Sequence, residues 1–142
     1  MTRIDFYLLK TGDPQERLRV ACRLIEKAYQ QSHNVFINCS DSSVAQQLDD
    51  MLWNIRETAF LPHTNLHNED IDSNAAIVIG AHPPEACHDL IINIDKTVPK
   101  VFERFTRLLE LVCQGDEAWV DIGRNNYRHY KQIGYPIHTH NL

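Results

Sequence analysis

Three short and almost continuous apolar runs constrain the fold of this 142-residue chain more than any other feature. They cover residues 34–39, 75–79 and 89–94. A strand with one face in water alternates apolar and polar side chains, whereas a strand that is buried on both faces is apolar throughout. These runs therefore predict interior strands of a parallel sheet that has helices packed on both of its faces.

The N-terminal half places helical patterns between such strands. Residues 4–9 predict a first strand, and the Asp13-Pro14 pair after it combines an N-cap with a first-turn proline, which starts a helix. Apolar side chains then recur at helical spacing until about Gln31. A second helix is expected after the cap at residues 40–42. Its apolar stripe is formed by Val44, Leu48, Met51 and Leu52.

The C-terminal half predicts two more helices. The first opens at Pro99 and is broken at residues 115–116, and the second runs from about 117 to 132. The stripe of the first consists of Val101, Phe105, Leu108 and Val112. Residues 55–74, with a proline, several asparagines and an acidic run, predict an irregular connection, and residues 135–137 begin a short extended tail.

Strands that alternate with helices of this length predict βαβ units and a mostly parallel sheet. The length suits one domain, so we expect residues 1–142 to form a single three-layer α/β sandwich with a mostly parallel central sheet. The fold is Rossmann-like, but its first strand–helix turn, residues 9–14, has neither the phosphate-loop motif nor the glycine-rich dinucleotide motif. A nucleotide site is therefore not expected.

The charge is unevenly distributed along the chain. The net charge is −5, and residues 41–95 hold ten acidic side chains and one basic one. An acidic protein is not expected to coat nucleic acid or an anionic membrane through its general field. After Asp121, however, there are three basic side chains and no acidic one. No apolar run approaches the roughly 18 residues of a membrane span, and the N-terminus has no signal core, so we expect a cytoplasmic protein.

The sequence gives little support to an enzyme. The four cysteines are far apart and lie among apolar residues, which is typical of reduced core thiols. His82, Cys87 and His88 have side chains that ligate zinc, but they lack a convincing fourth partner. A metal enzyme at this loop is a minor hypothesis, which a zinc analysis tests. We expect no catalytic residue, no metal and no cofactor.

The last predicted helix carries a basic stripe. Arg124, Tyr127, Arg128 and Lys131 stand at i, i+3, i+4 and i+7 and therefore share one face, with Tyr130 one position away from it. Such a face can hold an anionic partner, because guanidinium groups bind carboxylates while the aromatic ring packs on apolar groups. The other interpretation, a solvated cationic face favoured by the helix dipole, has equal weight on the pattern alone. Three charges suit a short acidic peptide better than a long nucleic-acid track.

A second feature is the docking patch, by which we mean Trp53, Phe60, Leu61 and Pro62. Together with Ile55, these residues place large apolar groups at the end of a helix and in an irregular connection. Buried, they would seal one end of the sheet, and exposed, they would bind a protein. We favour exposure slightly, because an irregular connection is a poor cover for so many large groups.

These two places, with the start of the chain, resemble the chi subunit family of the bacterial DNA polymerase III holoenzyme. The likeness lies in Phe6-Tyr7-Leu8-Leu9, in Leu52-Trp53 followed by Phe60-Leu61-Pro62-His63, and in the residues from Arg124 to Tyr135. The three motifs in this order, at this spacing and in a chain of this length, are specific, although any one of them alone is weak.

The resemblance implies a compact α/β adaptor without catalytic activity. Family members pair with a small psi subunit of the clamp loader and bind the acidic C-terminal tail of the single-stranded-DNA-binding protein, so they reach DNA indirectly. Carried over by motif, the psi-facing residues are those of the docking patch. The tail-binding residues are Arg124, Tyr127, Arg128 and Lys131. The psi-facing surface also joins a repair helicase in this family.

The alternative hypothesis is a module that binds single-stranded nucleic acid directly. It uses the same basic helix, with Tyr127 and Tyr130 as stacking platforms. Binding to a bare oligonucleotide distinguishes it from the adaptor, which needs the coating protein and its intact tail.

Overall fold

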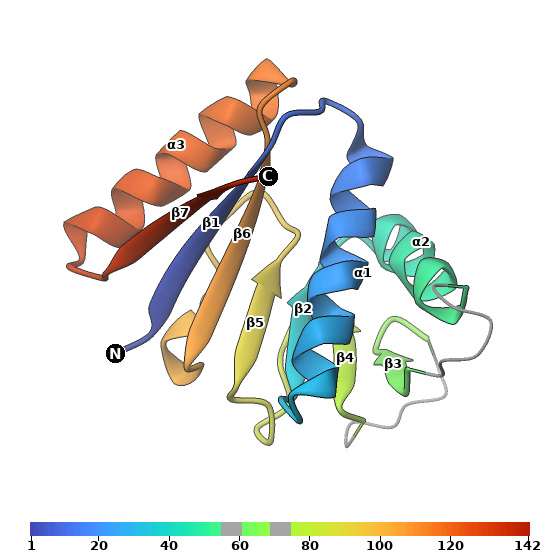
Figure 1. The fold of residues 1–142 in the computed structure, drawn as a ribbon. Helices are drawn as coiled ribbons and strands as arrows, with labels where there is room; N and C mark the ends of the chain where they lie inside the picture. The colour runs from blue at the N-terminus through green and yellow to red at the C-terminus, as the bar shows by residue number, and fades with distance from the viewer. Residues whose placement is uncertain (55–60, 69–74) are drawn as a thin grey trace.

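One parallel sheet organises the computed structural model, which describes residues 1–54, 61–68 and 75–142 (Figure 1). Its strands are β1 (Arg3–Leu9), β2 (Val35–Asn38), β3 (His63–Asn65), β4 (Ile77–Gly80), β5 (Leu90–Asn93), β6 (Arg107–Cys113) and β7 (Ile137–Asn141). Their order across the sheet is β3-β4-β2-β5-β6-β1-β7, and each neighbouring pair is parallel. The predicted α/β class and parallel sheet are confirmed.

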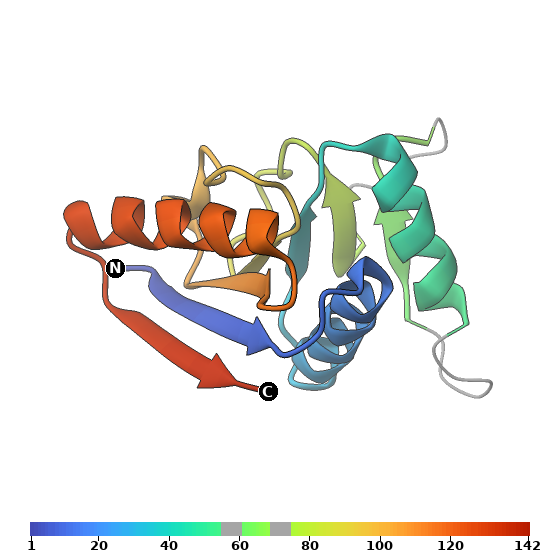
Figure 2. The same ribbon diagram turned by 90° about the horizontal axis from the view of Figure 1, so that it is seen from above.

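Helices cover both faces of this sheet. Helices α1 (Pro14–Gln30) and α2 (Ser42–Trp53) pack on one face, and α3 (Glu117–Gln132) packs on the other together with the 3₁₀ turn η1 (Phe102–Arg104). Figure 2 shows the sheet as the middle of three layers, with α1 and α3 on opposite sides. In the described part of the chain, no helix combines the length and the apolar character that membrane crossing requires.

The core has two halves because strand side chains alternate between the faces. On β5, Leu90 and Ile92 pack with the α1–α2 side, whereas Ile91 packs with the α3 side. The same alternation holds on β2, where Ile37 and Phe36 belong to different halves. All three apolar runs noted above are strands of this kind. The interpretation of strands buried on both faces is therefore confirmed.

The helix predicted from Pro99 is wrong. Only η1 is helical there, and the chain then forms β6, which lies between β5 and β1. Leu108 and Val112 do share one side, as the predicted stripe requires, but Leu109 and Leu111 are buried on the opposite side. A run that is apolar on both sides fits a central strand, and burial between two other strands decided its conformation.

At both edges of the sheet the structure has a short strand that the sequence pattern did not predict. Strand β3 lies inside the region that was expected to be irregular, and it pairs with β4. The extended tail is a strand, β7, which pairs with β1 from Ile137 to Asn141. Short polar strands of this kind have little periodicity of their own, so pairing with a neighbour defines them.

Truncation of a β6 side chain tests the assignment of this strand to the core. Leu109→Ala removes a buried side chain and is expected to lower the free energy of unfolding by about 3 kcal/mol. Leu142→Ala, at a leucine that is 51% exposed, is the matched control and should change it by less than about 0.5 kcal/mol. Urea unfolding followed by circular dichroism measures both, and equal losses would contradict a buried β6.

Candidate functional site

A pocket of about 450 Å³ lies between α3 and the sheet, and we call it the α3 pocket. Phe6, Leu8 and Val112 form an apolar floor from β1 and β6. Arg124, Tyr127 and Arg128 of α3 form its rim. The remaining lining residues are Gln114, Val120, Gly123 and Thr139. Three of the four residues of the predicted basic stripe therefore meet at one concave site.

Tyr127 joins the rim to the floor. Its ring packs edge-on against Phe6 with 5.5 Å between the ring centroids, while 36% of the residue stays exposed. Edge-to-face contacts of this geometry fix the orientation of an aromatic side chain. Tyr127 thus forms a wall of the pocket: its ring is held by the contact with Phe6, and part of the residue remains exposed to solvent.

The two rim arginines are available to a partner. Arg124 and Arg128 are exposed, and the acidic group paired with Arg124 is Asp121, at 4.0 Å between Nη1 and Oδ1. An ion pair of this length between exposed groups contributes little to stability. Lys131 continues the stripe but does not line the pocket, because it lies one helical turn farther on.

Gly123 sets how closely α3 approaches the sheet. A Cβ atom at this position would lie 2.9 Å from Val112 Cγ2, so a larger side chain would push the helix away from the pocket floor. Sequence reasoning missed this residue. The available signal was a glycine within a helix, which costs about 1 kcal/mol relative to alanine and therefore indicates a packing requirement.

The opposite side of α3 is anchored to a buried carboxylate, Glu110 of β6. Tyr130 Oη and Asn126 Nδ2 each donate a hydrogen bond to it at 3.2 Å, and Asn93 Nδ2 of β5 donates a third. Burial raises the pKa of Glu110 to about 7, although these hydrogen bonds oppose that shift. Tyr130 is fully buried, so it is not a stacking platform on the surface.

The docking patch divides between surface and core. Trp53, at the end of α2, is 56% exposed, whereas Leu61 is buried with the α1–α2 half of the core and Pro62 is partly buried. Phe60 and Ile55 lie outside the described residues. The expectation of exposure therefore describes Trp53, and the alternative, a core role, describes Leu61.

Trp53 rests on a buried histidine that sequence reasoning did not connect with it. The ring of His63 packs edge-on against Trp53 at 4.9 Å between centroids. Its Nε2 lies 3.0 Å from Asp49 Oδ1, and its Nδ1 lies 2.6 Å from the carbonyl oxygen of Leu61. These contacts tie the start of β3 to α2 beneath the tryptophan. No sequence signal links residues 49 and 63, because the contact depends on how α2 and β3 pack.

The carboxyl edge of the sheet, where open α/β folds bind phosphates, is occupied by aspartates. Asp13, Asp41 and Asp116 are the N-caps of α1, α2 and α3, and each carboxylate accepts one or two hydrogen bonds from backbone N–H groups of the first turn. A phosphate would need the same N–H groups and would meet a negative charge. The helix termini are therefore unsuited to phosphate binding.

The thiols are buried in apolar surroundings. All four cysteines are free, and burial raises the pKa of Cys22 and of Cys39 to about 12. Thiols with such pKa values are protonated at neutral pH and are poor nucleophiles. Within the described ranges, no three metal-ligating side chains of His, Cys, Asp or Glu come together.

Comparison with known proteins identifies the family. Residues 1–138 match the family model described as DNA polymerase III chi subunit, HolC. This chain belongs to the DNA polymerase III chi subunit family. The resemblance noted from three motifs is thereby confirmed, and with it membership of a family of accessory subunits of the replication machinery.

The curated chi subunits align over nearly their whole length. The DNA polymerase III subunit chi of Pseudomonas aeruginosa is 40% identical over 142 residues, which are 100% of this chain and 98% of the relative. The Haemophilus influenzae subunit is 26% identical, with 97% of this chain and 96% of the relative covered. The Escherichia coli subunit is 25% identical, with 98% and 97% covered.

The fold also occurs outside the chi family. The crystal structure of T4 UvsW superposes with a TM-score of 0.68 at 12% sequence identity, and the match covers 99% of this chain and 41% of that one. At this identity the likeness concerns the fold alone.

The buried Glu110 predicts a specific pH dependence of stability. The unfolded carboxyl has an ordinary pKa of 4.5 and the folded one about 7, so the folded state keeps a proton that the unfolded chain releases. The free energy of unfolding should therefore fall by up to about 3 kcal/mol as the pH rises from 4.5 to 7. Glu110→Gln should flatten this part of the profile in urea titrations, and identical slopes for both proteins would refute the assignment.

Proposed function

We propose that this chi-family chain is a non-catalytic adaptor whose α3 pocket binds the acidic C-terminal tail of a single-stranded-DNA-binding protein. The observation that supports it most is the pocket itself, in which two exposed arginines stand over an apolar floor. Such a tail ends in carboxylates and an apolar side chain, and both have a counterpart here.

Each part of the tail has a defined place in this proposal. Arg124 and Arg128 bind the carboxylates through charge-assisted hydrogen bonds. The apolar side chain enters between Tyr127 and the floor residues Phe6 and Leu8. Lys131, outside the pocket, attracts acidic residues that precede the terminus. Binding by a single tail is weak and sensitive to salt, and several tails on one oligomer strengthen it.

The structure favours a protein tail over bare nucleic acid as the ligand of α3. The alternative needs Tyr127 and Tyr130 as stacking platforms, but Tyr130 is buried against Phe6 and Phe102 and is bonded to Glu110. Proteins that bind single-stranded nucleic acid stack successive bases on several aromatic rings. One partly exposed tyrosine and three cations offer too few contacts for that kind of binding. In this proposal the chain therefore reaches DNA only through the coating protein.

The second half of the adaptor is a psi-like subunit that binds at the docking patch. Trp53 is the anchor, because an exposed tryptophan loses much apolar surface to water when a partner covers it. Leu61 supports the patch from the core, Pro62 lies at its rim, and Phe60 is assigned by the family motif. A repair helicase uses the same patch in place of the psi-like subunit.

One of the two rim arginines provides the first test. Arg128→Ala should weaken binding of a fluorescent acidic tail peptide about tenfold or more in an anisotropy titration, because a charge-assisted contact is lost. Arg19→Ala, at an exposed arginine of α1, is the matched control and should leave the affinity unchanged. Unchanged affinity in Arg128→Ala, or equal binding of a bare oligonucleotide, would refute the tail assignment.

The docking patch is tested by a reciprocal pair of variants. Trp53→Ala should abolish co-purification with the psi-like subunit while tail-peptide affinity stays intact, because the two sites lie on different elements. Tyr127→Ala should show the opposite behaviour. An undiminished complex with Trp53→Ala would remove Trp53 from the interface, and circular dichroism confirms that both variants are folded.

A further inference from the structure

Part of the sheet lacks a cover on the α1 side. Parallel sheets are normally covered on both faces. Helix α3 packs on one face of β1, β6 and β7, but on the other face α1 packs against β2 and β6. Figure 2 shows β1 and β7 with α3 on one side and no described helix opposite it.

An apolar groove runs along α1 at the border of this face. One part, of about 460 Å³, contains Tyr7, Val20, Leu24 and Leu142. A smaller part, of about 210 Å³, shares Tyr7 and Leu24 with it, so the two parts adjoin. Leu142 is 51% exposed, and Tyr7 and Leu24 are each partly exposed. These side chains offer an apolar strip that water covers in the free protein.

Cations surround one buried carboxylate on the same face. Asp5 accepts hydrogen bonds from Arg107 Nε at 2.7 Å and from Arg3 Nε at 3.2 Å, and its Oδ1 lies 2.8 Å from His140 Nε2. Burial acts to raise the pKa of Asp5, but the hydrogen bonds from Arg107, His140 and Arg3 together lower it. One carboxylate thus faces two permanent cations and a histidine.

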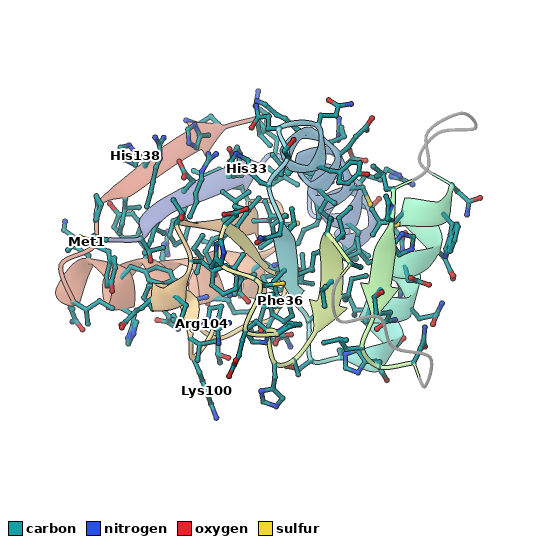
Figure 3. All side chains as sticks on the ribbon, turned by 90° about the horizontal axis from the view of Figure 1, so that it is seen from below. Met1, His33, Phe36, Lys100, Arg104 and His138 are labelled. Carbon is teal, nitrogen blue, oxygen red and sulfur yellow. The ribbon has the colours of Figure 1, made fainter. Side chains whose placement is uncertain are left out.

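The charge continues along the groove. Lys10 and Arg23 line the larger part, and Lys27 lines the smaller part. The cations at the two parts, Lys10, Arg23, Lys27 and Arg107, outnumber the acidic groups, Glu16 and Asp89, and Glu16 pairs with Arg23. His33 and His138 are also on this side, as Figure 3 shows. A protein of net charge −5 therefore has a locally basic face here.

We propose that this sheet-face groove binds an acidic amphipathic helix of a partner protein. The apolar stripe of that helix lies on Tyr7 and Leu24, and its acidic side chains face Arg3, Arg107 and Lys27. Such a helix extends the outer layer that α1 begins on this face of the sheet. Charge complementarity selects an acidic helix over a basic one.

A nucleic acid fits this groove less well. The rings of Tyr7 and His140 stack on each other at 4.7 Å between centroids and 20° between planes. Tyr7 Oη also accepts a hydrogen bond from Arg107. The aromatic groups are thus engaged with neighbours, and the rest of the floor is aliphatic.

The groove is separate from the α3 pocket. Side chains alternate along β1, so Phe6 and Leu8 point to the α3 pocket while Asp5 and Tyr7 point to the groove. The sheet lies between the two sites. Both can be occupied at once, and the groove does not depend on what binds to α3.

The test uses the full chain labelled with nitrogen-15 and a synthetic helical peptide with a leucine stripe and glutamates on its remaining faces. We expect the peptide to shift amide signals of β1, β6, β7 and α1, and to bind about tenfold tighter than a peptide with lysine in place of glutamate. Lys27→Glu and Arg3→Gln, combined, should weaken binding about tenfold. Lys100→Glu, at an exposed lysine that lines neither the groove nor the α3 pocket, should leave it unchanged.

Each other outcome overturns the proposal. Equal affinity for the two peptides removes the charge argument, and shifts confined to the α3 pocket place the peptide at the tail site. If sedimentation experiments show that the chain self-associates, and these amides are protected in the associated form, the occupant is a second copy of the chain. If a bare oligonucleotide shifts the same amides and displaces the peptide, the occupant is nucleic acid. Lys27→Glu alone, at an exposed residue, is expected to weaken peptide binding as well, and unchanged hydrogen exchange in this variant would separate loss of binding from loss of folding.

Discussion

The position of α3 depends on the buried carboxylate of Glu110. Its oxygens receive hydrogen bonds from Asn93 of β5 and from Asn126 and Tyr130 of α3, so a single side chain joins two strands to the helix. A buried polar group of this kind is tolerated only when its partners are in place, which makes the arrangement specific. Burial raises its pKa to about 7, so its protonation in the folded state changes within the neutral range.

This anchor leaves the opposite side of α3 exposed to solvent. Tyr130 and Asn126 hold the helix down, Gly123 allows close contact with Val112, and Arg124 and Arg128 then stand over a floor made by the strands. The rim residues come from one helix, but the floor comes from segments more than 100 positions apart in the chain. The pocket is therefore a property of the sandwich and not of the basic stripe.

Alternation along β1 gives the proposed adaptor more than one working surface. The same strand supplies Phe6 to the α3 pocket and Tyr7 to the sheet-face groove. Trp53 of the docking patch lies elsewhere, at the end of α2, where it packs on His63. Separate surfaces of this kind support the proposed adaptor role. The basic groups gather on α3 and along the groove, while the acidic side chains of residues 41–95 account for the net charge of −5.

The local sequence pattern was sufficient to predict those features that depend only on residues close together in the chain. The apolar runs of β2, β4 and β5, the caps that start α1 and α2 and the basic stripe of α3 could all be recognised from neighbouring residues, as could the family. Tertiary structure decided the remainder. Burial between two strands made β6 a strand despite its helical spacing, and pairing made β3 and β7 strands.

The same division holds for the sites. The chain alone determined which face of α3 is basic and that Trp53 adjoins an apolar connection, because helical geometry relates residues three and four apart. Packing alone decided that Tyr130 and Leu61 are buried, that Gly123 and Phe6 belong to the pocket, and that His63 supports Trp53. Those facts depend on contacts between distant segments, which a local pattern does not contain.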